Sequence, residues 1–428
     1  MQLDTQTSKN TRIILFLFAI QFVFIFTAEN RWQINFYTPF LLQATCLILA
    51  GYFIYIQKQQ THIKNTDINI SISPWRKILY FFTGTFTVAL SYEEVRKLFA
   101  RYPNASTLSD VMPQLDTQYD RFSHGIFPYS PVTSVPWQPY PVYMPLHWLP
   151  VGISRVLNID TRWSGFIILA IAAGLYGYVI LQRKAPTGLK IIALLLPSIV
   201  LWAYIVWGGI DIPAVLETLI SAYYLVLAIG LMSKNLVITT IGIILCLLSR
   251  YTLVFWLPIF LILLWQNLSP RKNFVVWLSI IAAITFVYLL PFLSKDHTVF
   301  LHGLVYHNGC AYNCWNDFMN NKYNSSYYSG LFFAPRLYDI FPGTIEHKVF
   351  LARAVQGGVM LFLLGVYLAI YRKVKEEINF YHYCLAALYV SVFIFMLFSP
   401  LIFKYYYMPV LTISAVMCAQ AIISNAKS

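Results

Sequence analysis

Charged residues are scarce in this chain of 428 residues, and their scarcity excludes most soluble folds. Lysine, arginine, aspartate and glutamate make up 11% of the sequence, whereas 58% of the residues are hydrophobic. Soluble domains usually carry about 25% charged residues. The hydrophobic residues gather in runs long enough to cross a hydrocarbon core of about 30 Å. The sequence therefore predicts an all-α polytopic membrane protein, in which residues 1–428 form a single integral membrane domain.

Several signatures of soluble enzymes are also missing. The chain has no glycine-rich phosphate loop after a strand, no paired zinc motif and no GxSxG elbow. It shows no internal repeat, heptad array or low-complexity tract. Since no strand-rich region is expected that could hold a nucleotide sugar, an activated substrate would have to arrive through the membrane.

About twelve transmembrane helices are predicted, together with two long connections that contain interfacial helices. The first two spans belong to an additional N-terminal part, 1–75, which ends in a polar inner linker. The long connections are 93–163 and 293–349. Within the first, 144–157 is expected to form an interfacial or re-entrant helix, because it is short for a span and contains two prolines. The predicted spans are 11–27, 37–56, 78–92, 164–182, 188–206, 213–231, 235–249, 252–266, 273–292, 350–371, 379–398 and 403–422.

The net charge of +13 is distributed as a topology signal. With the N-terminus in the cytoplasm, the inner segments carry 16 basic and four acidic residues, and the outer segments carry 14 basic and 13 acidic ones. Basic residues in short loops favour the cytoplasmic side. We therefore expect a multi-pass protein of the plasma (inner) membrane with cytoplasmic N- and C-termini and no nucleic-acid partner. The active site is expected on the extracytoplasmic face, where both long connections lie.

Two of the six cysteines fall in the second long connection. Cys310 and Cys314 would face an oxidising compartment, which permits a disulfide. With His302 and His307 nearby, a metal site is also conceivable, although the spacing matches no zinc signature. Both possibilities stay open at the level of sequence.

Carboxylates and aromatic residues gather in the first long connection. Asp110, Asp116 and Asp120 lie there between hydrophobic spans. Carboxylates are costly near lipid, and functional residues concentrate in long loops held by a rigid scaffold. This connection is therefore the expected place of the chemistry.

The order of motifs resembles that of membrane glycosyltransferases of the C superfamily, which use a polyprenyl-phosphate sugar as donor. The closest pattern is that of mannosyltransferases, both the bacterial family 87 type and the first mannosyltransferase of glycolipid-anchor synthesis. The resemblance covers about 95–425. It is carried by Asp110, Gly-Ile-Phe-Pro-Tyr at 125–129, Tyr-Met-Pro-Leu at 143–146, Trp-Gly-Gly-Ile-Asp at 207–211, Ser-Arg-Tyr at 249–251 before Leu-Pro at 257–258, Phe-Ser-Pro at 398–400 and Lys-Tyr-Tyr-Tyr-Met-Pro at 404–409.

The resemblance implies a general base in the first long connection. Inverting glycosyl transfer needs a carboxylate that takes the proton of the acceptor hydroxyl. Asp110 is the first candidate. Asp116 is a rival, because Val-Met-Pro follows Asp110 where the family usually has an aromatic residue. Asp120 is expected to hold the sugar or to position the loop. For each acid, a solvated or helix-capping role is the alternative.

The leaving polyprenyl phosphate needs cations at the outer membrane edge. Arg250 lies between two predicted spans, and Lys404 lies beside Tyr405 and Tyr406. Arg336, Arg353 and His307 are weaker candidates. Asp211 either contacts substrate or caps the following helix, and Tyr129 could stack on a sugar.

These residues together predict transfer of one hexose, with mannose favoured, to a lipid-linked or envelope glycan acceptor. No cofactor is required, although a divalent cation at Asp110 and Asp120 is possible. Two other classes stay open. One is a transporter or flippase of lipid-linked glycans, for which inverted repeats would be expected. The other is a polysaccharide polymerase or ligase, which relies on arginines and a histidine more than on a loop aspartate.

Overall fold

The computed structural model describes residues 5–31, 37–61, 73–104, 109–320, 331–401 and 403–425. Every regular element in these ranges is helical, which confirms the all-α class. Most of the predicted inner linker of the N-terminal part lies outside the described residues, as does a section of the second long connection.

Within the described residues, eight helical stretches are long and apolar enough to cross a membrane, which supports a multi-pass membrane protein. Two of them continue into a second element without a break. The eight stretches are α1 (Thr5–Arg31), α2 (Tyr37–Thr61), α8 (Trp163–Leu181), α9 (Thr187–Trp207), α13 (Pro270–Ile284) with the π-helical η3 (Thr285–Leu293), α16 (Ile345–Val374), α17 (Phe380–Leu397) and η4 (Lys404–Tyr406) with α18 (Tyr407–Asn425).

Four predicted spans correspond to shorter helices, so length and composition establish eight crossings and not twelve. These helices are α3 (Pro74–Ala89), α10 (Glu217–Ser233), α11 (Leu236–Leu247) and α12 (Leu257–Asn267). Proline accounts for part of the shortening, because it lacks the backbone N–H that a helix interior needs. Pro213 lies before α10, and Pro258 occupies the first turn of α12.

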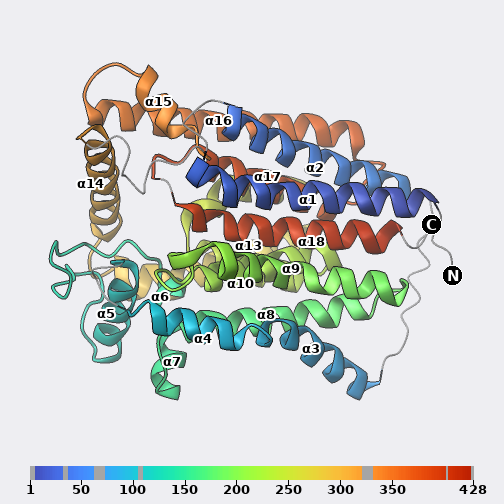
Figure 1. Ribbon diagram of the computed structural model, residues 1–428, viewed down its shortest axis with the longest axis horizontal. Coiled ribbons are helices and arrows are strands. Elements are labelled where there is room, and N and C mark those ends of the chain that lie inside the picture. The colour runs from blue at the N-terminus through green and yellow to red at the C-terminus, as the bar shows by residue number, and fades with distance from the viewer. Residues whose placement is uncertain are drawn as a thin grey trace.

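The long helices run side by side, and most helices of the two long connections lie at one end of the bundle (Figure 1). α1 begins and α18 ends at the opposite end. We call the end of the bundle that lies away from the two chain termini the loop end. It is formed by α5 (Val111–Ser123), α6 (Pro145–Trp148), α7 (Val151–Leu157), α14 (Val299–Asn320), α15 (Ala334–Ile340) and the turns that precede η2 (Tyr251–Phe255) and η4.

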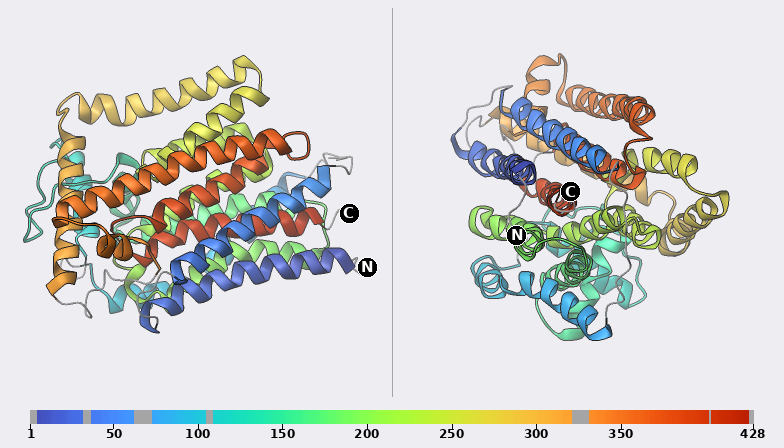
Figure 2. Two further views of the ribbon diagram at one scale, coloured as in Figure 1. Left: turned by 90° about the horizontal axis from the view of Figure 1, so that it is seen from above. Right: turned by 90° about the vertical axis from the view of Figure 1, so that its right-hand side faces the viewer.

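Helix α14 crosses the loop end at a steep angle to the long helices (Figure 2). It connects α13, at the edge of the bundle, with the segment that leads to α15 and α16. The second long connection therefore contains a helix that lies across the bundle, as expected for an interfacial element. Its position brings residues of this connection over those of the first.

Two details of the first long connection differ from the prediction. The segment 144–157 is not one helix but two, α6 and α7, which are separated at Leu149 and Pro150. The chain is also helical at the start of the connection, where α4 (Tyr92–Arg101) follows α3 after a short turn. Glu93 and Glu94 open α4 and form ion pairs with basic residues one turn later.

Helices α3 and α8, which flank the first long connection, approach each other very closely. A Cβ atom on Gly84 of α3 would lie 2.9 Å from Cα of Gly177 in α8. Small residues allow such backbone contact between helices in membranes. The two helices from which the connection departs and to which it returns are therefore packed directly together.

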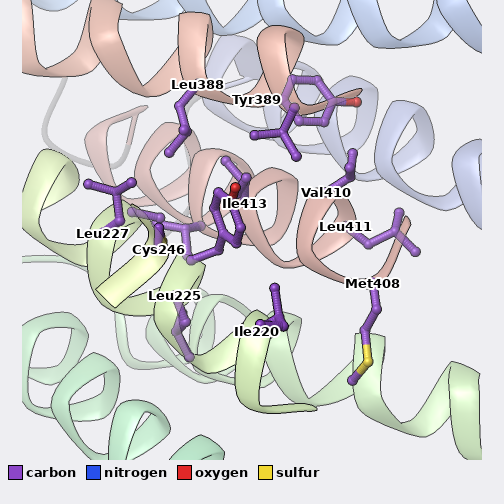
Figure 3. Packing of buried hydrophobic residues seen from close by; sticks show 14 of the residues in the cluster. Ile220, Leu225, Leu227, Cys246, Leu388, Tyr389, Met408, Val410, Leu411 and Ile413 are labelled. Atoms are coloured by element: carbon purple, nitrogen blue, oxygen red, sulfur yellow. The ribbon is translucent and has the colours of Figure 1, made fainter. Parts of the chain in front are cut away.

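The core lies where α10, α17 and α18 meet. Side chains such as Ile220, Leu388 and Ile413 converge there from these three helices (Figure 3). In the most apolar stretch of η4 and α18, all residues are buried. In the corresponding stretch of α13 and η3, only 17% of the residues are buried. Helix α18 is therefore central, whereas α13 leaves most of its apolar surface exposed, as expected for a helix that faces lipid.

The N-terminal helix pair is packed into this core. Helices α1 and α2 contact α17 and α18. Tyr389 of α17 is fully buried, and its hydroxyl donates a hydrogen bond to Oε1 of Gln21 in α1 over 2.7 Å. A buried polar bond between helices fixes their relative position. The additional N-terminal part is thus an integral layer of the bundle.

Candidate functional site

Asp110 lies where the two long connections meet. It immediately precedes α5 and is half-buried. Its Oδ2 accepts a hydrogen bond of 3.0 Å from the amide of Gln114 and one of 3.2 Å from the hydroxyl of Tyr306 in α14. Both donors are neutral. The carboxylate is therefore oriented without being paired to a cation through either bond, which leaves it able to accept a proton.

Tyr143 lies between Asp110 and Arg250. It occupies the extended turn before α6, and burial raises the pKa of its hydroxyl well above the usual range. The negative charge of Asp110 raises this pKa further, whereas the positive charge of Arg250 opposes the rise. One enclosed tyrosine thus interacts electrostatically with both the predicted base and a predicted phosphate ligand.

Arg250 forms a bidentate ion pair with Glu217. Nη1 and Nη2 donate to the two carboxylate oxygens over 2.6 and 2.8 Å, and the Glu217 side chain is only 1% exposed. The guanidinium also lies 5.4 Å from the centre of the Tyr406 ring. Two parallel charge-assisted bonds give this pair a fixed geometry. Arg250 is therefore a cation at the site, and Glu217 already balances its charge.

Lys404 is paired with Asp211. Its Nζ lies 3.4 Å from Oδ2 of Asp211, and each side chain is 12% exposed. The hydroxyl of Tyr204 donates to the backbone carbonyl of Lys404 over 2.9 Å. The capping interpretation of Asp211 is wrong, because α10 begins six residues later at Glu217 and Asp211 instead ends the 3-10 helix η1 (Gly209–Asp211).

Asp116 and Asp120 both contact Arg155. Nη2 of Arg155 lies 3.0 Å from Asp116 and 3.1 Å from Asp120, and its Nε donates to Asp120 over 3.2 Å. Asp116 also accepts a bond of 2.6 Å from Thr161. These contacts tie α5 to α7 and to the start of α8. The three acids at and within α5 therefore have different partners. Asp110 contacts α14, whereas Asp116 and Asp120 contact α7.

Tyr129 is enclosed within the first long connection. Only 5% of the residue is exposed, and its hydroxyl donates to the carbonyl of Tyr143 over 3.1 Å. The indole of Trp148 donates to the same hydroxyl over 3.3 Å. Its ring meets those of Trp148 and Phe292 edge-on. These contacts hold the loop together and orient Tyr143, whereas Tyr405 and Tyr406 remain half-buried beside Arg250.

Tyr406 has a second cationic neighbour besides Arg250. Arg353 of α16 has electrostatic contact with Tyr406 and Tyr312. Its Nε and Nη2 are buried and have no hydrogen-bond partner among the described residues. His307 of α14 is close to this arginine: burial, Arg353 and Arg250, in that order, lower the pKa of His307 to about 4. His307 is therefore neutral at physiological pH.

Cys310 and Cys314 are free thiols on successive turns of α14. Cys310 lies next to Tyr306 and Asp110, so the pair faces the site. In the part of the chain that is described, no three histidine, cysteine or acidic side chains are arranged to hold a metal ion. Asp110 and Asp120, the expected ligands of a divalent cation, contact different partners.

Comparisons with protein-family models, curated proteins and solved structures found no match. Function is therefore inferred from the geometry of the loop end together with the resemblance in motif order.

Sequence reasoning did not single out two residues that connect the site, Tyr143 and Tyr306. Tyr143 belongs to a motif that the sequence did show, but its role depends on the distance between two connections. Tyr306 is one helical turn before Cys310, so a helical periodicity over 302–314 would have placed both on one face.

Proposed function

We propose that the protein is an inverting hexosyltransferase with twelve membrane spans, which uses a polyprenyl-phosphate sugar. The observation that supports this most is the junction of the two long connections. There the Asp110 carboxylate accepts hydrogen bonds from neutral donors. Tyr143 interacts electrostatically with Asp110 and also with Arg250 and Tyr406, so these groups lie around one tyrosine. A base and cations at the end of a membrane bundle are what transfer from a lipid-borne phosphate needs.

In this proposal Asp110 accepts the proton of the acceptor hydroxyl. The hydroxyl oxygen then forms a bond to the anomeric carbon of the donor sugar. The bond from that carbon to the phosphate oxygen breaks, and the polyprenyl phosphate leaves with the electron pair. Positive charge near Tyr406 stabilises the leaving phosphate. Hydrogen bonds from Tyr306 and Gln114 keep the Asp110 carboxylate oriented, and neither donor carries a positive charge.

We propose further that the loop end lies on the extracytoplasmic side of the plasma membrane and that both termini are cytoplasmic. The position of the chain ends supports this arrangement, because α1 begins and α18 ends at the same end of the bundle, away from the loop end (Figure 1). The excess of basic residues in the short inner segments supports the same orientation. The favoured sugar is mannose, and the favoured acceptor is a lipid-linked or envelope glycan.

The decisive experiment is transfer by the purified protein in lipid nanodiscs. It uses a polyprenyl-phosphate hexose labelled in the sugar and a lipid extract from a deletion strain as acceptor. A product longer by one hexose, with inverted anomeric configuration, would support the proposal. If no polyprenyl-phosphate hexose serves as donor and the deletion leaves all glycans unaltered while a lipid flux stops, a flippase would be the better interpretation.

A polysaccharide polymerase or ligase is the second candidate, since Arg250, Arg353 and His307 lie near one another at the loop end. Such enzymes rely on arginines and a histidine. The product distinguishes the two functions: a hexosyltransferase adds one residue to each acceptor, whereas a polymerase or ligase moves a preassembled chain.

A further inference from the structure

The cationic side chains of Arg250, Lys404 and Arg353 differ in how their charge is balanced. Arg250 has Glu217 and Lys404 has Asp211, in ion pairs with little exposure to solvent. Arg353 has no carboxylate partner of this kind among the described residues, and two of its guanidinium nitrogens are buried without a hydrogen bond. The two cations that the sequence marked as phosphate ligands are therefore already neutralised, and the third is not.

A buried cation without a partner is costly. Removing a charge from water has a penalty that only a counter-ion and well-placed hydrogen bonds offset. Donor groups left unpaired inside a protein also lose hydrogen bonds that they would make to water. Arg353 therefore has the properties expected of a side chain that is complete only when an anion is bound.

From this arrangement we infer that Arg353, together with His307 and Tyr406, forms the anion subsite that receives a phosphate group at the loop end. The inference rests on the proposed function and makes it more specific, because it moves the phosphate from Arg250 and Lys404 to Arg353. The planar guanidinium presents donors at the spacing of two phosphate oxygens. Neutral His307 and the Tyr406 hydroxyl can each donate one further hydrogen bond.

The charges around this subsite favour an anion over a second cation. Arg250, whose guanidinium lies over the Tyr406 ring, adds positive potential, although Glu217 balances its charge. The nearest acid of the first long connection, Asp110, is bonded to Gln114 and Tyr306. Tyr306, which contacts Asp110, and His307, which interacts with Arg353, are consecutive residues of α14, so the proposed base and the proposed anion subsite are both next to the same segment of this helix.

The test is binding of polyprenyl phosphate without a sugar to the full-length protein in nanodiscs. Inorganic phosphate and the uncharged polyprenol serve as the other two ligands. We expect Arg353→Gln to weaken polyprenyl-phosphate binding about 10- to 100-fold, and Arg353→Lys to restore part of it. Lys348→Gln is the matched control: Lys348 lies on the same helix and contacts Tyr338, so its loss should leave binding unchanged.

Two further measurements separate binding from folding. The melting temperature of the ligand-free Arg353→Gln protein should be equal to or higher than that of the wild type, because a half-buried charge without a counter-ion is gone. The rise in melting temperature caused by polyprenyl phosphate should be smaller than in the wild type. If inorganic phosphate alone competes with polyprenyl phosphate at Arg353, the subsite recognises the headgroup; if polyprenol competes equally well, the assignment of an anion subsite is wrong.

Unchanged polyprenyl-phosphate binding in Arg353→Gln would also overturn the inference. This outcome is distinguishable from failure of the proposed function, because the binding measurement needs no sugar transfer. Conversely, transfer that survives Asp110→Asn would remove the proposed base while leaving the Arg353 subsite intact.

Discussion

The two ends of α5 hold the same type of side chain in opposite electrostatic surroundings. At its start, Asp110 accepts hydrogen bonds from an amide and a phenol. Further along the helix, Asp116 and Asp120 share the guanidinium of Arg155. The two later acids are held in ion pairs, although burial raises the pKa of Asp116 and outweighs the opposing effects of Thr161 and Arg155. Under the proposed function, the acid at the start of the helix takes part in proton transfer, and the two later acids hold the loop.

The contrast also concerns what each acid connects. Asp116 and Asp120 join α5 to α7, within one connection, whereas Asp110 reaches α14 in the other. Loss of an internal contact should therefore lower stability first. Loss of the contact between the two connections should lower activity first.

The largest expected effect is that of Asp110→Asn on sugar transfer. The amide keeps a hydrogen-bond acceptor in place but cannot take a proton, so the transfer rate should fall about 100- to 10,000-fold. The melting temperature should stay close to that of the wild type. The rate is measured with labelled donor in nanodiscs, and Asp120→Asn at the other end of the same helix is the control. Equal losses in the two variants would contradict the contrast within α5.

A smaller effect, on stability, is expected for Glu217→Gln. It leaves the Arg250 guanidinium without its counter-ion in a buried place, which typically costs about 3–5 kcal/mol. Thermal unfolding in detergent would show it. The double variant with Arg250→Met should recover part of the loss, because no unpaired charge remains. A double variant less stable than Glu217→Gln alone would show that Arg250 has a further structural partner.

Arg155→Ala should lower stability moderately and activity little. The substitution deprives Asp116, whose side chain is 19% exposed, of its cation, and it breaks the connection between α5 and α7. We expect a loss of about 1–2 kcal/mol, the cost of a charge-assisted hydrogen bond. Chemical unfolding measures the loss. A transfer rate as low as that of Asp110→Asn would show that Asp116 or Asp120 takes part in the chemistry.

The smallest effect should be that of Asp120→Asn on stability. Asp120 and Arg155 are 51% and 39% exposed, and water screens such a pair. The expected change is about 0.2–1 kcal/mol. Raising the salt concentration should reduce the difference from the wild type, since exposed ion pairs are screened. A salt-independent difference would indicate that Asp120 acts through a contact other than Arg155.

Much of the fold could be predicted from the sequence because hydrophobic runs report directly on membrane helices. All twelve expected segments are helical, and the long helices lie where the runs were. The ends were harder to predict. Pro150 divides 144–157 into two helices, and Glu217 starts α10 later than the hydrophobic run does. These boundaries depend on single residues whose effect is decided by packing and ion pairing.

The candidate site was predictable only in part. Asp110 and Arg250 stood out because both lie in or beside outer segments of an apolar protein. The partners of the acids and of Arg250 could not be predicted, because they are far away in the sequence. Arg155 is 39 residues from Asp116, and Glu217 is 33 residues from Arg250. Arg353 was only one of the weaker phosphate-binding candidates in the sequence. That it has buried nitrogens without partners is a property of the packed bundle, which no local pattern records.

The glycine contact between α3 and α8 has a consequence for the first long connection. This connection follows α3 and ends at α8, and because these two helices pack directly together, its two ends are held near each other. A loop closed in this way has already lost the entropy of bringing its ends together. Under the proposed function, closure of the connection around a sugar would then require only internal rearrangement. A larger side chain at Gly84 would push α3 away from α8 and so loosen the connection although it lies within the bundle.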